Sequence, residues 1–147
     1  MLTLDGSIGE GGGQIVRTAI TLSCITGTPV IIENIRAGRS TGGLRPQHVT
    51  AIHAAAAISG AEVDGARVGS QTVLFEPGEH VRAGEYEWSV GTAGATTLVL
   101  QTILLPLAQE IGMHEVELSA NGYRTYTQRV QIAQPKPHTM VVPLERL

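Results

Sequence analysis

The chain of 147 residues is 42% hydrophobic and carries a formal net charge of -3, a composition that excludes the disordered class. Its apolar runs are too short to cross a bilayer, and its single cysteine, Cys24, cannot form an internal disulfide. Since its first residues lack a signal peptide's pattern, we expect a cytoplasmic protein with no membrane partner. The apolar surroundings of Cys24 favour a small core residue over a reactive thiol.

The first half of the chain predicts a β-α-β-α-β-β unit. The expected elements are a strand at 1–4, a helix at 14–27, a strand at 28–35, a helix at 45–60 and two strands within 61–78. Both helices end at a glycine, and Pro46 suits the first turn of the second helix. The last two strands are joined either at Asp64-Gly65 or around Val68-Gly69-Ser70.

The second half repeats this plan in shortened form. Its expected elements are a strand at 85–91, a helix at 92–112, a strand at 114–121 and two weaker strand candidates at 126–135 and 139–147. Pro106 would cost ~3 kcal/mol inside the helix, so we expect a kink or break near Leu105. No second helix follows. We therefore divide the chain into a complete first repeat, 1–82, and an abbreviated second repeat, 83–147, that share one domain.

The glycine-rich turn DGSIGEGGGQ, residues 5–14, raises the question of phosphate binding. It is not a P-loop, because no Lys-Ser/Thr follows the glycines, and Gln14 stands where the G-x-G-x-x-G pattern needs its third glycine. A helix beginning near Gln14 would still present free N–H groups and a positive dipole end to an anion, and Arg17 would share its face. The alternative is that the glycines only allow tight packing and that Arg17 is solvated.

Charge is unevenly distributed along the chain. Residues 1–60 sum to +1, residues 61–120 to -7 and residues 121–147 to +3, so any polyanion site must be local. The window RAGRSTGGLRPQ contains three arginines, Arg36, Arg39 and Arg45, together with Gln47, and no acid. Loop arginines are usually only solvated, but this clustering with glycine turns and a helix start favours phosphate binding.

Four segments resemble the RNA 3'-terminal phosphate cyclase family, in the family's order. They are DGSIGEGGGQIVRTAITLSCITGTPV, IRAGRSTGGLRPQH, VGSQTVLFEPG and GTAGATTLVLQTILLP, and the match covers roughly residues 2–106. The resemblance implies an α/β fold, an α+β sandwich of repeated β-α-β-α-β-β units. Each unit has a four-stranded sheet backed by two helices, and the second unit is incomplete here.

The resemblance also implies an activity, the ATP-dependent conversion of an RNA 3'-phosphate to a 2',3'-cyclic phosphate through an adenylylated histidine. ATP, Mg2+ or Mn2+ and an RNA 3'-phosphate end are the implied cofactors and partners. By match to the family's motifs, Glu10 lies near the nucleotide and the metal, and Gln101 contacts the nucleotide. The implied phosphate- or RNA-binding residues are Gln14, Arg17, Arg36, Arg39 and Gln47.

The sequence departs from the family in one chemical respect. The family's nucleophilic histidine belongs to a His-x-x-Asp-Gln motif, and none of the five histidines here has that context. We therefore assign no catalytic residue and expect a cyclase-like chain that is inactive or partial by itself. The alternatives are a non-catalytic RNA- or nucleotide-binding module, and a chain that self-associates or pairs with another chain to cover its sheet edges.

Overall fold

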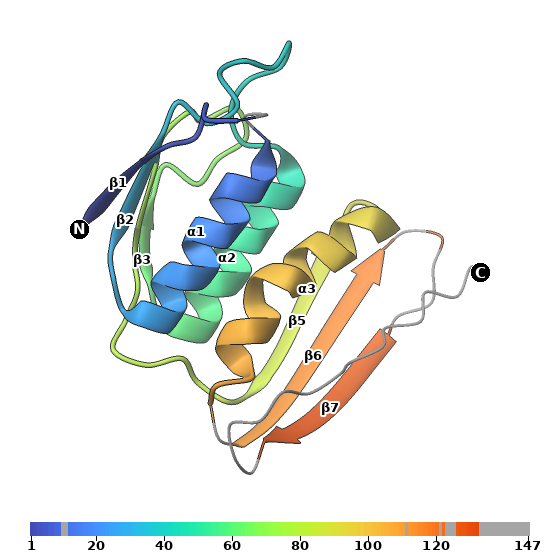
Figure 1. Ribbon diagram of the computed structural model, residues 1–147. Coiled ribbons are helices and arrows are strands. Elements are labelled where there is room, and N and C mark those ends of the chain that lie inside the picture. The colour runs from blue at the N-terminus through green and yellow to red at the C-terminus, as the bar shows by residue number, and fades with distance from the viewer. Residues whose placement is uncertain (10–11, 111, 121, 123–125, 133–147) are drawn as a thin grey trace.

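The computed structural model describes residues 1–9, 12–110, 112–120, 122 and 126–132 (Figure 1). The helices are α1 (Gly13–Thr26), α2 (Pro46–Ser59) and α3 (Ala93–Leu107). The strands are β1 (Leu2–Asp5), β2 (Val30–Glu33), β3 (Glu62–Asp64), β4 (Val73–Glu76), β5 (Glu85–Val90), β6 (Gly112–Ala120) and β7 (Tyr126–Ile132). The expected order of elements is confirmed as far as β7, and the candidate strand at 139–147 lies outside the described residues.

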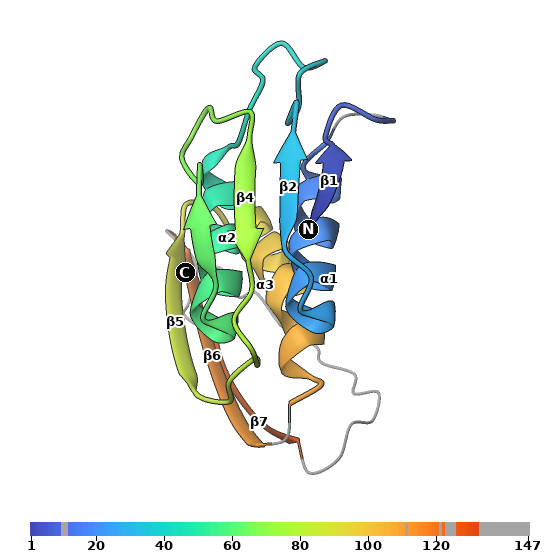
Figure 2. The same ribbon diagram turned by 90° about the vertical axis from the view of Figure 1, so that its left-hand side faces the viewer.

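The first unit forms a four-stranded mixed sheet with the order β1-β2-β4-β3. β1 pairs with β2 in parallel, because α1 carries the chain back between them, whereas β4 is antiparallel to both of its neighbours. α1 and α2 cover the same face of this sheet (Figure 2). The predicted unit, a four-stranded sheet backed by two helices, is therefore confirmed.

The described part of the second unit contains one helix and three strands, and the predicted abbreviation of this repeat stays a prediction. β5, β6 and β7 form a three-stranded sheet in that order, with β5 and β6 parallel and connected through α3. The three helices described form a layer between the two sheets, and all three begin at the same end of the molecule (Figure 1). The architecture is thus an α+β sandwich.

The core lies on the inner face of the four-stranded sheet and between the helices. Phe75 of β4 is fully buried, and Ile32 of β2 and Ile20 of α1 pack in the same cluster. Cys24 is also buried there, and burial raises the pKa of its thiol to about 11. This confirms the expectation of a core residue.

α3 continues through Leu105 and Pro106 and ends at Leu107, five residues before the predicted helix end at 112, so a break at Leu105 does not occur. The other expected outcome, a kink near Leu105, stays a prediction. An α-helix would pair the N–H of residue 106 with the carbonyl of residue 102, and proline has no N–H. The Thr21 hydroxyl on α1 lies 2.9 Å from that Thr102 carbonyl and 2.9 Å from the Arg17 carbonyl of its own helix, so its one hydrogen is shared between the two acceptors. A neighbouring helix thus satisfies the group that the proline leaves unpaired.

Candidate anion site at the helix starts

The site lies where β1 and β2 end and where α1 and α2 begin (Figure 1). The two strands are parallel, so both of their carboxyl ends meet at this edge of the sheet. The Gly6 N–H donates to the Glu33 carbonyl at 2.7 Å, which ties the glycine-rich turn to the end of β2. The turn after β1 and the arginine loop after β2 are therefore neighbours in space.

The N-terminus of α1 suits an anion. Gly12 is its N-cap residue, no side chain of the described residues makes a capping hydrogen bond there, and the first turn contains no acid. The first N–H groups of a helix have no partner within the helix, and they add to the positive end of its dipole. Backbone donors therefore point toward the arginine loop.

Arg17 lies one turn into α1 and is held by its neighbour. Its Nη2 donates to Gln14 Oε1 at 2.7 Å, and Gln14 Nε2 donates in turn to Thr18 Oγ1 at 3.0 Å. The Nε of Arg17 is buried without a hydrogen-bond partner, and burial lowers the pKa of the guanidinium. A buried, unpartnered cationic donor is costly, so a bound anion would stabilise this arrangement.

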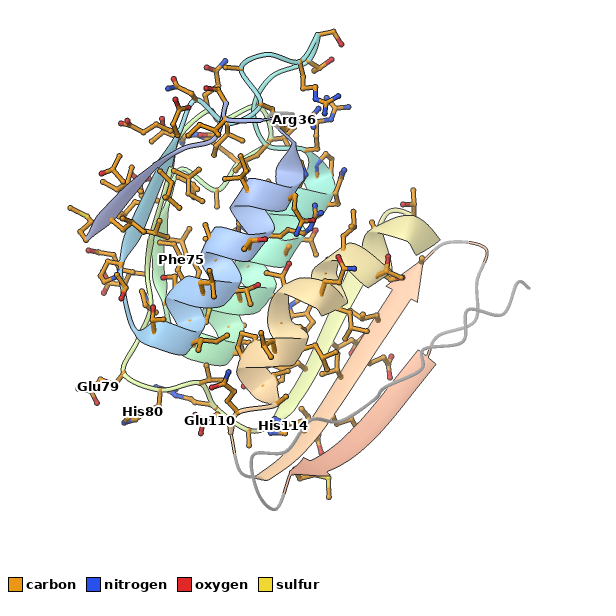
Figure 3. All side chains as sticks on the ribbon, in the orientation of Figure 1. Arg36, Phe75, Glu79, His80, Glu110 and His114 are labelled. Carbon is orange, nitrogen blue, oxygen red and sulfur yellow. The ribbon has the colours of Figure 1, made fainter. Side chains whose placement is uncertain are left out.

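The loop after β2 supplies two further guanidinium groups. Arg36, labelled in Figure 3, has a left-handed backbone with a φ of 57°, and its Nη2 donates to the Thr41 carbonyl at 3.3 Å. Its Nε is also buried without a partner. Arg39 is exposed, and its Nη2 lies 3.9 Å from where a Cβ on Gly12 would stand. This proximity places an arginine of the loop beside the helix start.

His48 lies at the centre of this cationic group. It is 3% exposed, its Nδ1 accepts the Arg45 N–H at 3.0 Å, and a Cβ on Gly13 would overlap its ring. Burial, followed by the positive charges of Arg36, Arg17 and Arg45, lowers the pKa of His48 to about 4. Three arginines from separate parts of the chain thus act on one imidazole, and the same potential would attract phosphate.

The structure brings together four of the residues selected from the sequence: Gln14, Arg17, Arg36 and Arg39. Gln47 is half-buried on the first turn of α2, and Gln101 is exposed on α3. No hydrogen bond described for either glutamine side chain joins it to the arginines. Glu10 lies outside the described residues. The binding roles of all seven residues remain predictions.

Sequence reasoning did not select His48 for the site. The sequence marks this histidine only as lacking the context of the family's nucleophile, whereas the structure packs its ring against the start of α1. One signal was present in the sequence. His48 follows the N-cap residue Arg45 by three positions, where a polar side chain often reaches back to the cap N–H.

Neither a metal-binding cluster nor a membrane-spanning helix is present in the part of the chain that the structure describes. Its His, Cys, Asp and Glu side chains nowhere form a group of three or more that could hold a metal ion. None of its helices is both long and apolar enough to span a membrane.

Fold and site together define an α/β sandwich that offers helix N-termini and guanidinium groups to an anion. The family model for RNA 3'-terminal phosphate cyclase matches residues 8–134. The chain therefore belongs to the RNA 3'-terminal phosphate cyclase family.

Individual relatives bear the same name, RNA 3'-terminal phosphate cyclase. The protein of Caldivirga maquilingensis is 56% identical over 122 residues, which cover 83% of this chain and 34% of the relative. That of Ralstonia nicotianae is 60% identical over 103 residues, or 70% of this chain and 29% of the relative. That of Archaeoglobus fulgidus is 56% identical over 107 residues, which cover 73% of this chain and 32% of the relative. This chain matches about a third of the length of these relatives.

Proposed function

We propose that this chain provides the phosphate-binding part of an RNA 3'-terminal phosphate cyclase reaction. The site would hold the 3'-terminal phosphate of an RNA, or the phosphates of ATP, between the start of α1 and the loop after β2. The observation that carries this proposal is geometric: the Nε atoms of Arg17 and Arg36 are buried without a partner, and Arg39 Nη2 lies 3.9 Å from where a Cβ on Gly12, the N-cap residue of α1, would stand. Burial, followed by the charges of Arg36, Arg17 and Arg45, lowers the pKa of the neighbouring His48 to about 4. The family to which the chain belongs supports the choice of an RNA end as ligand.

In the proposed reaction, AMP is transferred from ATP to the RNA 3'-phosphate with release of pyrophosphate. The 2'-hydroxyl then attacks the activated phosphate, loses its proton and displaces AMP, leaving a 2',3'-cyclic phosphate. Both displacements concentrate negative charge on phosphate oxygens. Guanidinium groups and helix N–H donors fixed in advance around those oxygens lower the barrier. The unpaired Nε atoms of Arg17 and Arg36 are suitable donors.

The two implied small ligands fit the described residues to different degrees. The phosphates of ATP match the guanidinium cluster, because arginine binds phosphate oxygens through two donors at once. Mg2+ or Mn2+ would neutralise phosphate charge, but its implied ligand, Glu10, lies outside the described residues.

A second candidate function, binding without catalysis, is favoured by the state of the described histidines. His48 is buried, its Nδ1 is engaged, and it stays neutral down to a pH of about 4. His114 is also buried, with its Nε2 on the Glu110 carbonyl. His53 and His80 are exposed, and neither has the His-x-x-Asp-Gln context of the family's nucleophile. We propose that this chain alone binds phosphate ends but does not become adenylylated.

The binding proposal is tested by fluorescence anisotropy with two RNA oligonucleotides that differ only in a 3'-phosphate or a 3'-hydroxyl. We expect the phosphorylated end to bind at least ~10-fold more tightly, since it adds charge-assisted hydrogen bonds. Arg36→Ala and Arg39→Ala should each remove most of that preference. Arg82→Ala is the matched control, because this exposed arginine lies near Gly60, where α2 ends. Equal weak affinities that vanish with salt would contradict the proposal.

Catalysis is tested separately with ATP labelled at the α-phosphate, in the presence of Mg2+ or Mn2+. We expect no covalent label on the chain. Label found on any histidine would refute the non-catalytic assignment and leave the binding proposal intact.

A further inference from the structure

Exposed apolar side chains gather around β1. Of the seven large hydrophobic residues that are exposed in the described part of the chain, three belong to β1 and its flanking residues and one to α1. They are Met1, Leu2, Ile8 and Leu22. A cluster of this kind at one edge of a sheet is unusual for a surface that faces only water.

Leu22 lies on the side of α1 that faces away from α2, toward the edge of the sheet where β1 lies in the order β1-β2-β4-β3 (Figure 2). Cys24 faces α2, where its Sγ approaches the Ala55 carbonyl, and Thr21 faces α3. Two residues along an α-helix turn the side chain by about 200°, so Leu22 points away from α2. It is 50% exposed. Leu2 and Leu4 alternate with Thr3, so both stand on the sheet face that α1 covers, where Leu4 packs against the core.

Among the residues that the structure describes, none pairs with the outer side of β1. Leu2 and Gly6 donate to the carbonyls of Pro29 and Glu33, at 2.8 and 2.7 Å, so the even-numbered residues pair with β2. Thr3 lies between them and directs its N–H and C=O toward the free edge, since β1 is the edge strand of its sheet. An edge strand with free donors and acceptors is a template for another strand.

The other strand edges whose side chains are described carry charge. β3 presents Glu62 and Asp64, and β5 presents Glu85 and Glu87. Charged side chains on an edge prevent pairing with another chain. β1 has none before Asp5, so it is the edge that remains able to pair.

We propose that β1 pairs with β1 of a second copy of this chain, antiparallel and centred on Thr3. A two-fold axis at Thr3 joins its N–H to the carbonyl of the copy's Thr3, and reciprocally. Leu2 then lies opposite the copy's Leu4, on the apolar side, and Leu22 of both copies covers the junction. Asp5 meets the copy's Met1, so no carboxylate faces another. Two copies of β1 are thus complementary in hydrogen bonding, in apolar pattern and in charge. For this reason we choose a second copy of the chain as the partner at this edge.

Sedimentation velocity of the 147-residue chain across a concentration series tests this inference. We expect a reversible dimer, and Thr3→Pro, which removes the central donor at an edge position, should weaken it by at least ~10-fold. Leu22→Lys should have a similar effect. Leu105→Lys is its matched control, because Leu105 is equally exposed, at 52%, but lies on α3. This control should leave the dimer unchanged.

Circular dichroism shows whether each variant is folded. If Thr3→Pro does not fold, the weakening of the dimer is judged from Leu22→Lys alone. A chain that stays monomeric at ~1 mM would overturn the inference. So would a dimer whose dissociation constant is unchanged in both Thr3→Pro and Leu22→Lys. Loss of the dimer in Leu105→Lys alone would move the interface to α3 and overturn it equally. None of these outcomes bears on phosphate binding, which Arg36 and Arg39 test.

Discussion

Replacing Gly13 by alanine tests the packing that supports the anion site. Gly13 is the first residue of α1, and a Cβ added there would overlap the imidazole of His48. The ring cannot turn aside freely, because it is 3% exposed and its Nδ1 accepts the Arg45 N–H at 3.0 Å. Either α1 must shift outward or His48 must give up its hydrogen bond.

Two opposing effects decide the result. Glycine to alanine in a helix stabilises by at most ~1 kcal/mol, and by less at the first position. Overpacking a filled site costs ~1–3 kcal/mol, and losing the hydrogen bond of a buried group adds ~1 kcal/mol. We therefore expect Gly13→Ala to lower the free energy of unfolding by ~1–3 kcal/mol.

Urea denaturation followed by circular dichroism measures this change. Gly94→Ala is the matched control, because Gly94 also lies in the first turn of a helix, has no positive φ and has open space around its Cβ position. That variant should gain ~0.5–1 kcal/mol. In a His48→Ala background, which removes the ring, Gly13→Ala should no longer destabilise. A Gly13→Ala chain as stable as the wild type would refute the close packing of α1 on His48.

Three further predictions concern stability and reactivity. The lowered pKa of His48, about 4 against 6.5, means that the unfolded chain binds more protons between these values, so stability should fall as pH falls from 6.5 toward 4. Urea titrations should show a loss of ~2 kcal/mol between pH 7 and 5 that His48→Gln reduces. Thr21→Val should cost ~1–3 kcal/mol by unpairing the Thr102 carbonyl, and less in a Pro106→Ala background, a difference that a double-mutant cycle measures. A disulfide reagent should modify Cys24 at least ~100-fold more slowly in the native state than in urea, because the thiol is buried with a pKa of about 11.

The order of elements could be predicted because local chemistry decides it. Gly27 and Gly60 adopt left-handed backbones that end α1 and α2, and Pro46 begins α2, as expected of these residues. The extent of α3 could not be predicted in this way. Pro106 leaves the Thr102 carbonyl without its helical N–H partner, and the donor near that carbonyl is the Thr21 hydroxyl, on a helix about eighty residues earlier in the chain.

The candidate site, too, could be predicted from the sequence only in part. The glycine turn and the arginine window were visible in the sequence, because glycine runs and clustered guanidinium groups are uncommon. The position of His48 between them depends on how α2 packs on α1, and the left-handed φ of Arg36 depends on the loop as a whole. Neither follows from residue type or spacing.

All three helices begin at the end of the molecule where Arg36 lies, whereas Glu79 and Glu110 lie at the opposite end (Figure 3). Aligned in this way, the peptide dipoles of the described helices reinforce one another at the end where α1 and α2 begin. An anion that binds there, as we propose, meets this positive potential together with the guanidinium groups, so its affinity should fall as ionic strength rises.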